Sequence, residues 1–340
     1  MKISARTPNR IDLAGGTLDI YPLYIFLEGG YTLNAAIDLY SQVDLTPRED
    51  SDFYFESVDF GTELRVSRED LLAGKADDSD FRLLVQGLKA YLPEQGLNIR
   101  SFNQAPKGSG LGASSALLIA LSGALNQWNA VYPQGEQLIH RAADLEAWVL
   151  DIPTGKQDYY AALYGGLQAI HFDQAGVQRE HIHLPTDMYT TLNEGLVLSF
   201  TGESHFSGTN NWNMMKRYID NSGETRKSLK AIQATSAALY QALKKADLEQ
   251  VYQLLNQEWK NRQALAEGVT TPQIDKMIAA ANAAGAKANK ICGAGGGGCL
   301  LTLCEPGDKS AVAAALESTG ATLMENRMTP QGLQVNVFED

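Results

Sequence analysis

The stretch Pro106-Lys-Gly-Ser-Gly-Leu-Gly-Ala-Ser-Ser-Ala116 places three glycines directly in front of a run of helix-forming residues. Glycines leave the backbone of a turn uncovered, so several N–H groups can point at one anion, with the positive end of the following helix dipole behind them. Ser114 and Ser115 fall in the first helical turn, where a hydroxyl can cap the helix or coordinate a magnesium ion held by phosphates. The stretch therefore predicts a phosphate-binding turn. An ordinary flexible turn capped by serine is the alternative.

Two established phosphate loops fit this stretch less well. Gly108-x-Gly110-x-x-Ala113 satisfies the loose dinucleotide-binding fingerprint, which follows a buried strand and needs an acid about 20 residues further on. Here the preceding strand, Leu97–Phe102, is half polar, and no parallel strand carrying such an acid follows the helix. The Walker A pattern GxxxxGK[ST] occurs nowhere. A dinucleotide-binding oxidoreductase stays an alternative that NAD binding would test.

The composition predicts a soluble globular protein of the cytoplasm. The chain has 340 residues, enough for about two domains, with 44% hydrophobic and 20% charged residues. Its net charge of −12 and scattered Lys and Arg residues disfavour nucleic acid as a partner. The strongly apolar stretch Ala116–Leu121 continues only to Leu125, far short of the roughly 18 residues of a membrane span. The N-terminus lacks an apolar signal segment, and three cysteines without paired spacing fit a reducing compartment.

Hydrophobic periodicity predicts an α+β fold, with strands first and helices gathered later. The predicted strands are Lys2–Ala5, Arg10–Leu13, Tyr31–Asp38, Tyr40–Pro47, Phe53–Val58, Glu63–Val66, Leu97–Phe102, Leu167–Phe172, Gly195–Phe200, Lys290–Cys292, Cys299–Cys304 and Leu333–Phe338. The predicted helices are Phe81–Tyr91, Ala116–Ala130, Gln134–Leu150, Gln157–Leu163, a block over Met214–Leu265, Thr271–Ala284 and Ala311–Thr319. A polar loop is predicted over Thr201–Trp212, and a domain boundary in the polar stretch His183–Glu194.

Two further segments carry unusual patterns. Pro8–Asp19 places Arg10 and Asp12 on one face of an apolar strand, followed by a Gly-Gly turn and Asp19. Alone, it reads as an edge strand with a salt bridge. Gly293-Ala-Gly-Gly-Gly-Gly-Cys299 lies between two short strands, and so many glycines indicate close backbone approach or movement over a ligand. An ordinary flexible hairpin is the alternative.

Together the three segments resemble the GHMP small-molecule kinase superfamily. Motif one is similar to Pro8–Asp19, motif two to Pro106–Ala116 and motif three to Lys290–Leu300, so the resemblance spans nearly the whole chain. It implies a two-domain GHMP kinase fold: an N-terminal ribosomal-S5-like α/β domain over residues 1–190 and a C-terminal ferredoxin-like α+β domain over 191–340. The active site would lie in the cleft between them.

Within the superfamily, the chain resembles the sugar 1-kinase branch, and most closely the D-glycero-D-manno-heptose 7-phosphate kinases. The Ala-Gly-Gly-x-x-Asp of motif one, Gly155-Lys-Gln-Asp-Tyr-Tyr160 and Gly165-Gly166 carry this likeness. Galactokinases have Gly-Glu-His-Thr-Asp, and heptose-phosphate kinases Gly-Gly-Gly-Thr-Asp, where this chain has Gly-Gly-Thr-Leu-Asp19. The Thr-Gly loop has His205 where an arginine is expected, which leaves open whether the sugar already carries a phosphate.

The resemblance assigns site residues one by one. It implies ATP binding by Lys107, Gly108, Ser109, Gly110, Leu111, Gly112, Ala113, Ser114 and Ser115, and substrate binding by Gly15, Gly16, Asp19, Gly295 and Gly296. Asp158 matches the catalytic carboxylate and Arg10 the motif-one cation, while Ser114 and Glu146 match the Mg²⁺ ligands. Independently, Glu146 lies at the edge of an apolar helical stripe, where its carboxylate would be partly desolvated unless a cation meets it.

The implied activity is transfer of the γ-phosphoryl group of ATP to a hydroxyl, with the anomeric one favoured, of a sugar or sugar phosphate such as a heptose 7-phosphate. The alternatives are a mevalonate-type or other small-alcohol kinase of the same superfamily, and a non-catalytic nucleotide or sugar sensor. The implied cofactors are ATP and Mg²⁺. The expected partner is the small-molecule substrate, without nucleic acid or membrane, and a homodimer is left open.

Overall fold

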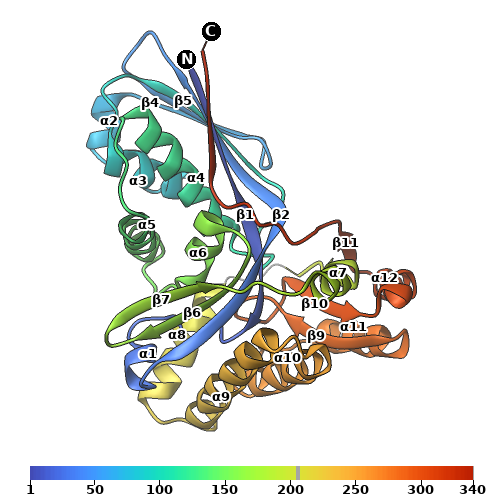
Figure 1. Cartoon of the computed structure of the whole chain (residues 1–340). Coiled ribbons are helices and arrows are strands. Elements are labelled where there is room, and N and C mark those ends of the chain that lie inside the picture. The colour runs from blue at the N-terminus through green and yellow to red at the C-terminus, as the bar shows by residue number, and fades with distance from the viewer. Residues whose placement is uncertain (204–206, 340) are drawn as a thin grey trace.

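The computed structural model describes residues 1–203 and 207–339. Over these residues the strands form an eight-stranded sheet and a four-stranded sheet. The larger is ordered β12-β1-β2-β5-β3-β4, with β6 paired to β2 and β7 paired to β6, and the smaller is ordered β11-β8-β10-β9. The larger sheet fills the upper part and the centre of Figure 1, and the smaller one lies at the lower right. The strands are β1 (Lys2–Ala14), β2 (Gly30–Pro47), β3 (Phe53–Ser57), β4 (Thr62–Val66), β5 (Leu97–Asn103), β6 (Leu167–Asp173), β7 (Gly176–His181), β8 (Leu196–Phe200), β9 (Ala286–Ile291), β10 (Cys299–Cys304), β11 (Thr322–Met324) and β12 (Gln334–Phe338).

The long strands β1 and β2 form the backbone of the larger sheet. They pair antiparallel from Ile3↔Leu45 to Ala14↔Leu33, with register shifts at Pro8/Asn9 and Asp12/Ala14. The sequence predicts each of them as two shorter strands, and this is wrong. Proline and asparagine break the local alternation at the first bulge, whereas pairing with the neighbouring strand keeps the backbone extended through it.

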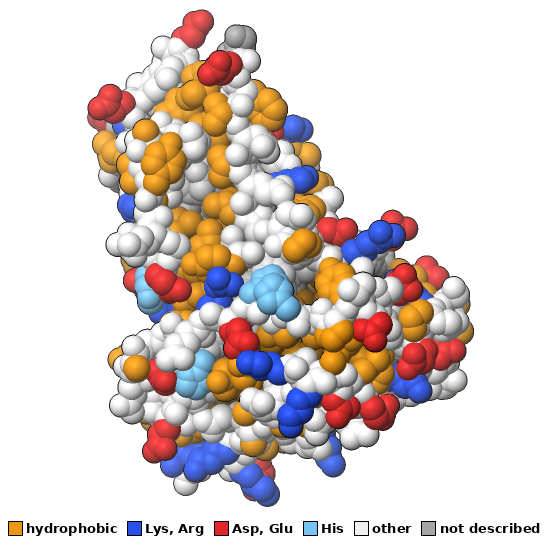
Figure 2. Space-filling model, in the orientation of Figure 1, with side chains coloured by type: hydrophobic (Ala, Val, Ile, Leu, Met, Phe, Trp, Pro, Cys, Tyr) orange, Lys and Arg blue, Asp and Glu red, His pale blue; other side chains and the backbone are white. Residues whose placement is uncertain are grey.

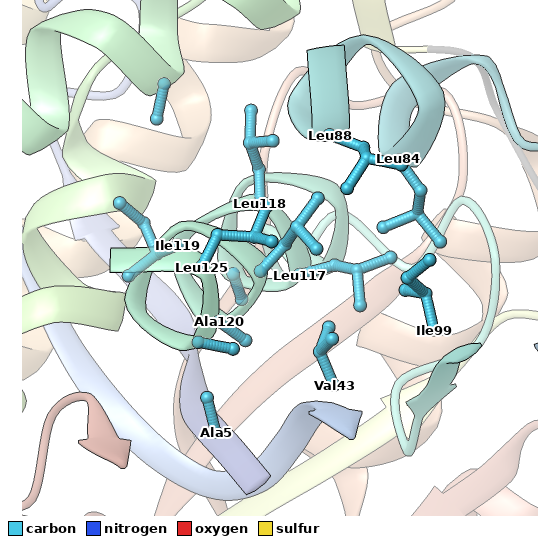
Figure 3. Packing of buried hydrophobic residues seen from close by; sticks show 14 of the residues in the cluster. Ala5, Val43, Leu84, Leu88, Ile99, Leu117, Leu118, Ile119, Ala120 and Leu125 are labelled. Atoms are coloured by element: carbon cyan, nitrogen blue, oxygen red, sulfur yellow. The ribbon is translucent and has the colours of Figure 1, made fainter. Parts of the chain in front are cut away.

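Helix α4 (Ala113–Trp128) is the central packing element of this part of the chain. It is buried on nearly all sides, as its Leu/Ala composition predicts. In Figure 3, Leu117 of α4 lies between Leu84 and Val43, and all three belong to one buried cluster. Because α4 is held on all sides, the loop that opens it is fixed in place. The other helices of this part are α1 (Leu23–Phe26), α2 (Arg68–Leu72), α3 (Arg82–Tyr91), α5 (Gly135–Leu150) and α6 (Gln157–Tyr164).

The smaller sheet is covered by helices of the second half of the chain. Helix α10 packs on β9 and on α9, and α9 also reaches β2, so the two halves share a buried cluster. In Figure 1, α9 and α10 lie below the central strands, while α11 and α12 lie beside the smaller sheet. These elements are α7 (Thr186–Glu194), α8 (Ser207–Ile219), α9 (Thr225–Lys244), α10 (Leu248–Gln263), α11 (Pro272–Ala283), the 3-10 turn Pro306–Asp308 and α12 (Lys309–Ser318).

The last strand returns to the first sheet. β12 pairs antiparallel with β1, with Val337 opposite Ile3. Residues 334–338, which the predicted division assigns to the C-terminal domain (191–340), thus extend the larger sheet at the edge of β1, where backbone groups would otherwise stay unpaired. The boundary near residue 190 stays a prediction.

Helices occupy two polar stretches, one predicted as a domain boundary and the other as a loop. α7 occupies most of the predicted boundary stretch, and the predicted loop over 201–212 is helical from Ser207, where α8 begins. Packing of Met188 and Leu192 stabilises α7 despite its polar composition. Within the described ranges, none of the helices combines the length and apolar composition that a membrane crossing requires. On the face in Figure 2, acidic and basic side chains are interspersed over the lower part.

Candidate active site

The glycine-rich turn before α4 adopts a conformation that side chains disfavour. Gly108, Gly110 and Gly112 have φ values of 72°, 73° and 76°, in the left-handed region, and Gly112 is the N-cap of α4. A Cβ at Gly110 would lie 2.3 Å from the carbonyl oxygen of Cys292. The backbone N–H of Cys299 donates to the Ser109 carbonyl over 2.8 Å. The glycine-rich turn before α4 and the glycine-rich segment 293–298 therefore lie in contact, and glycine at position 110 allows this close approach.

Arg10 joins this turn to Asp158. Its Nε and Nη2 atoms lie 2.7 and 2.6 Å from Asp158 Oδ1, and Nη1 donates to the Gly110 carbonyl. Asp158 lies in the first turn of α6 and against Gly112, where an added Cβ would be 3.0 Å from its Cγ. Burial raises the pKa of Asp158, although Arg10 pulls it down. Burial lowers the pKa of Arg10, but Asp158 and Asp12 outweigh it, so the guanidinium stays charged.

Glu146 of α5 points at the start of α4. It accepts a hydrogen bond from Ser115 Oγ over 2.8 Å and another from the Tyr159 hydroxyl. Burial raises the pKa of Glu146, and hydrogen bonds from Ser114, Tyr159 and Ser115 pull it down. Its hydrogen-bond partners in the described part of the chain are thus hydroxyls, and Glu146 as a whole is 4% exposed. A buried carboxylate beside hydroxyls matches the oxygen ligands that Mg²⁺ prefers.

These residues do not make a complete metal site by themselves. Over the described ranges, no three His, Cys, Asp or Glu side chains gather around one point that could hold a metal. Mg²⁺ commonly keeps several waters and is bound through one or two carboxylates together with substrate phosphates. The donor set at Ser114 and Glu146 fits an ion that arrives with a nucleotide.

Asp19 lines the same cavity as Arg10 and Asp158. Its two carboxylate oxygens accept backbone N–H bonds from Gln157 (2.9 Å) and Thr17 (3.1 Å). Burial raises its pKa to about 6, with further upward pressure from Asp158 and Asp12. Gly155 leaves room for it, since a Cβ there would lie 2.4 Å from Oδ2. A carboxylate of this kind can accept hydrogen bonds from hydroxyl groups.

A cavity of about 190 Å³ connects these groups. Of the predicted site residues, those that line it are Arg10, Gly16, Asp19, Gly108, Ser109, Gly110, Leu111, Gly112, Ala113, Ser114, Ser115, Glu146 and Asp158. The predicted residues placed elsewhere are Lys107, Gly15, Gly295 and Gly296. Lys107 Nζ lies 5.6 Å from the centre of the Phe60 ring. Gly15 packs against the Tyr31 carbonyl, and Gly296 N–H bonds the Val269 carbonyl.

The sequence did not indicate a buried cluster of charges that contacts the Gly16–Thr17 turn, called the motif-one turn below. Asp12, Glu258, Arg262 and Lys290 are each fully buried and ion-paired. Glu258 and Arg262 lie four residues apart on the buried side of α10, together with Leu255. Two opposite charges at this spacing within an apolar stripe were the available signal. Gln157 and Asn211 also line the cavity and were not predicted.

The comparisons with known proteins agree with this geometry. The family model described as GHMP kinases N terminal domain matches residues 81–166, and the one described as GHMP kinases C terminal matches residues 239–322, together half of the chain. A D-glycero-alpha-D-manno-heptose 7-phosphate kinase of Campylobacter jejuni is 27% identical over 336 residues, covering 98% of both chains. A mevalonate kinase of Pyrococcus furiosus is 25% identical over 350 residues, again covering 98% of both.

Solved structures share the whole fold. The structure described as a D-glycero-D-manno-heptose 1-phosphate kinase from Bacteriodes thetaiotaomicron has a TM-score of 0.76 at 23% identity, covering 99% of this chain and 100% of that one. The mevalonate kinase of Methanococcus jannaschii has a TM-score of 0.77 at 17% identity, covering 97% and 98%. The predicted GHMP kinase fold is thus confirmed, and with both family models matched the chain belongs to the GHMP kinase family.

Proposed function

We propose that the protein is an ATP-dependent kinase that transfers the γ-phosphoryl group to a hydroxyl, with the anomeric one favoured, of a sugar or sugar phosphate. The observation that carries the proposal is the Arg10–Asp158 pair. It places a carboxylate with a raised pKa directly against Gly112, at the start of α4, in a cavity that Asp19 also lines. An acceptor alcohol and a phosphate chain can both reach this carboxylate.

Asp158 accepts the proton of the attacking hydroxyl in this proposal. General-base catalysis of this kind contributes typically about 10²–10⁴-fold to a rate. Burial raises the pKa of Asp158 and so makes it a better proton acceptor, while Arg10 keeps the carboxylate oriented. Phosphoryl transfer needs positioning and charge stabilisation more than covalent chemistry. The backbone N–H groups of residues 108–112, with the N-terminus of α4, supply part of that stabilisation.

Ser114 and Glu146 are the residues that would hold Mg²⁺. When bound, the ion neutralises part of the negative charge of the phosphates. Ser115 and Tyr159 keep the Glu146 carboxylate oriented through their hydroxyl hydrogen bonds. Ser115 and Tyr159 thus keep the Glu146 carboxylate directed at the N-terminus of α4.

The acceptor is proposed to be a polyol, and a heptose 7-phosphate is the first candidate. Asp19 offers a buried carboxylate for hydroxyl groups, and the relatives at full coverage include a heptose 7-phosphate kinase. His205, which stands where an arginine is expected, lies outside the described residues. We place the activity in the cytoplasm, where ATP is available. A homodimer stays a prediction that size-exclusion chromatography tests.

The test is an ADP-release assay with Mg-ATP and a panel of acceptors. The panel holds hexoses and their phosphates, heptoses and their phosphates including the 7-phosphate, and mevalonate. We expect a heptose or its 7-phosphate to stimulate ADP release above the rate with ATP alone, and the product to carry a new phosphate by mass spectrometry. Stimulation by mevalonate alone would instead assign the mevalonate-type activity. Nucleotide binding without any stimulated turnover would favour a sensor.

A further inference from the structure

The buried charge cluster below the motif-one turn consists of Asp12, Glu258, Arg262 and Lys290. Lys290 Nζ lies 2.8 Å from Asp12 Oδ2 and 3.7 Å from Glu258 Oε2, and Arg262 Nη2 lies 2.6 Å from Glu258 Oε1. Two acids balance two bases, and every one of these side chains is 0% exposed. A buried ion pair contributes little net stability compared with apolar residues of similar volume. Net stability therefore does not explain why four charged side chains are buried at this place.

Arg262 extends this cluster to the wall of the cavity. Its Nη2 donates to the Gly16 carbonyl over 2.7 Å, and its Nη1 donates to Thr17 Oγ1 over 3.4 Å. Gly16 and Thr17 both line the cavity next to Asp19. One guanidinium therefore joins Glu258 of α10 to two consecutive residues of the turn.

The conformation of the Gly16–Thr17 turn requires stabilising contacts from outside the turn. Thr17 has a φ of 83°, in the left-handed region that a β-branched residue strongly disfavours. The backbone N–H of Thr17, in this conformation, donates to Asp19 Oδ1 over 3.1 Å. The contacts thus run from Glu258 through Arg262 to Thr17 and then to the carboxylate that faces the cavity.

We propose that Arg262, anchored by Glu258, is a positioning residue that holds the Gly16–Thr17 turn and thereby the Asp19 carboxylate in place for the acceptor. The inference rests on the proposed function in one respect, that Asp19 meets the acceptor's hydroxyls. It adds that helix α10, in the second half of the chain, controls acceptor affinity without touching the acceptor. In the proposed function ATP binds at the turn before α4, whereas the hydrogen bonds of Arg262 go to Glu258, Gly16 and Thr17.

The geometry requires arginine rather than any cation. A guanidinium presents several N–H donors in a rigid fork and so reaches Glu258, Gly16 and Thr17 together, whereas an ammonium is a single point charge. Arg262→Lys keeps the charge opposite Glu258 and loses part of the fork. A double variant, Glu258→Met with Arg262→Met, removes both charges together and leaves the Asp12–Lys290 pair intact. Replacing a buried pair by apolar residues is often neutral for stability.

The first experiment compares Michaelis constants. We expect both variants to raise the acceptor KM about tenfold or more, the scale of a lost charged hydrogen bond, with the ATP KM changed less than twofold. Arg68→Lys is the matched control. Arg68 lies on α2, outside the lining of the cavity, and it also donates to a backbone carbonyl, that of Glu94, over 2.8 Å. Equal changes in both Michaelis constants, or none in either, would overturn the proposal.

The second experiment is hydrogen–deuterium exchange on the free protein. The amides of Leu18 and Ile20 bond the carbonyls of Gly15 and Thr17 within the turn, at 3.0 and 3.2 Å. We expect them to exchange about tenfold faster in both variants, while amides of α4 keep the wild-type rate. Unchanged exchange in the turn, or loss of folding in both variants, would overturn the proposal. If the wild-type protein phosphorylates no acceptor, the proposed function fails, and exchange still decides whether Arg262 holds the turn.

Discussion

The raised pKa of Asp19 leads to a prediction about stability. The value of about 6, against 3.8 in an unfolded chain, means that ionising this carboxyl in the folded protein costs about 3 kcal/mol. Since the folded-state pKa is the higher one, the folded protein holds the proton more tightly. The stability that the neutral carboxyl contributes is complete below about pH 4 and is lost as the pH rises through 6.

Asp19→Asn keeps the side chain neutral at every pH and should therefore stabilise the protein increasingly as the pH rises. From the two pKa values, the penalty removed is ~1 kcal/mol at pH 4.5 and ~3 kcal/mol at pH 8. The amide also loses one of the two N–H bonds that the carboxylate accepts, from Gln157 and Thr17. That loss adds an offset that is nearly the same at both pH values, so the change of ~2 kcal/mol between them is the quantity to measure.

Thermal unfolding without ligand measures this change. For a chain of this length, ~2 kcal/mol corresponds to about 3 °C in Tm. The Tm of Asp19→Asn minus that of the wild type should thus rise by about 3 °C from pH 4.5 to pH 8, while acceptor turnover is lost. Asp144→Asn is the control, an exposed carboxylate on α5, and should show no such trend. A Tm difference that stays constant over this range would refute the reasoning.

Three further predictions concern the ATP side of the cavity. Asp158→Asn should lower kcat by about 10²-fold or more with ATP affinity nearly unchanged, as single-turnover kinetics and nucleotide titration can check; unchanged turnover would show that Asp158 is not the base. Ser114→Ala should shift the magnesium dependence of turnover to higher concentration, and an unaltered magnesium titration would count against its ligand role. Gly110→Ala should abolish nucleotide binding measured by calorimetry, because its Cβ would lie 2.3 Å from the Cys292 carbonyl oxygen and φ is 73°; wild-type affinity would contradict the close approach.

Much of the site could be predicted because its signals are local. The glycines before α4 indicate a left-handed turn, and the apolar composition of the following helix indicates that this helix is buried. Glu146 is visible from its place beside an apolar stripe, and the structure confirms its burial. Each of these signals is contained in a window of about 18 residues or fewer, over which helical periodicity is defined.

The features that the sequence did not indicate depend on distant partners. The stretch that forms α7 was predicted only as a polar domain boundary, because the stability of this helix comes from Met188 and Leu192, which pack into a buried cluster with residues of other elements. Strand β12 joins β1 across more than 300 positions of sequence, a pairing that alternation alone cannot assign.

Periodicity and glycine spacing, which act between near neighbours, thus indicated the α+β class, the left-handed turn before α4 and the buried position of Glu146, whereas Asp158 was assigned through the family resemblance. Only the tertiary structure decided which charges meet. Asp12, Glu258, Arg262 and Lys290 come from three separate segments of the chain. The spacing of Glu258 and Arg262 on α10 is a local signal for that pair, but it does not indicate that Asp12 and Lys290 join them. The tertiary fold excludes water from all four at once, and ion pairing then becomes the condition for burying any of them.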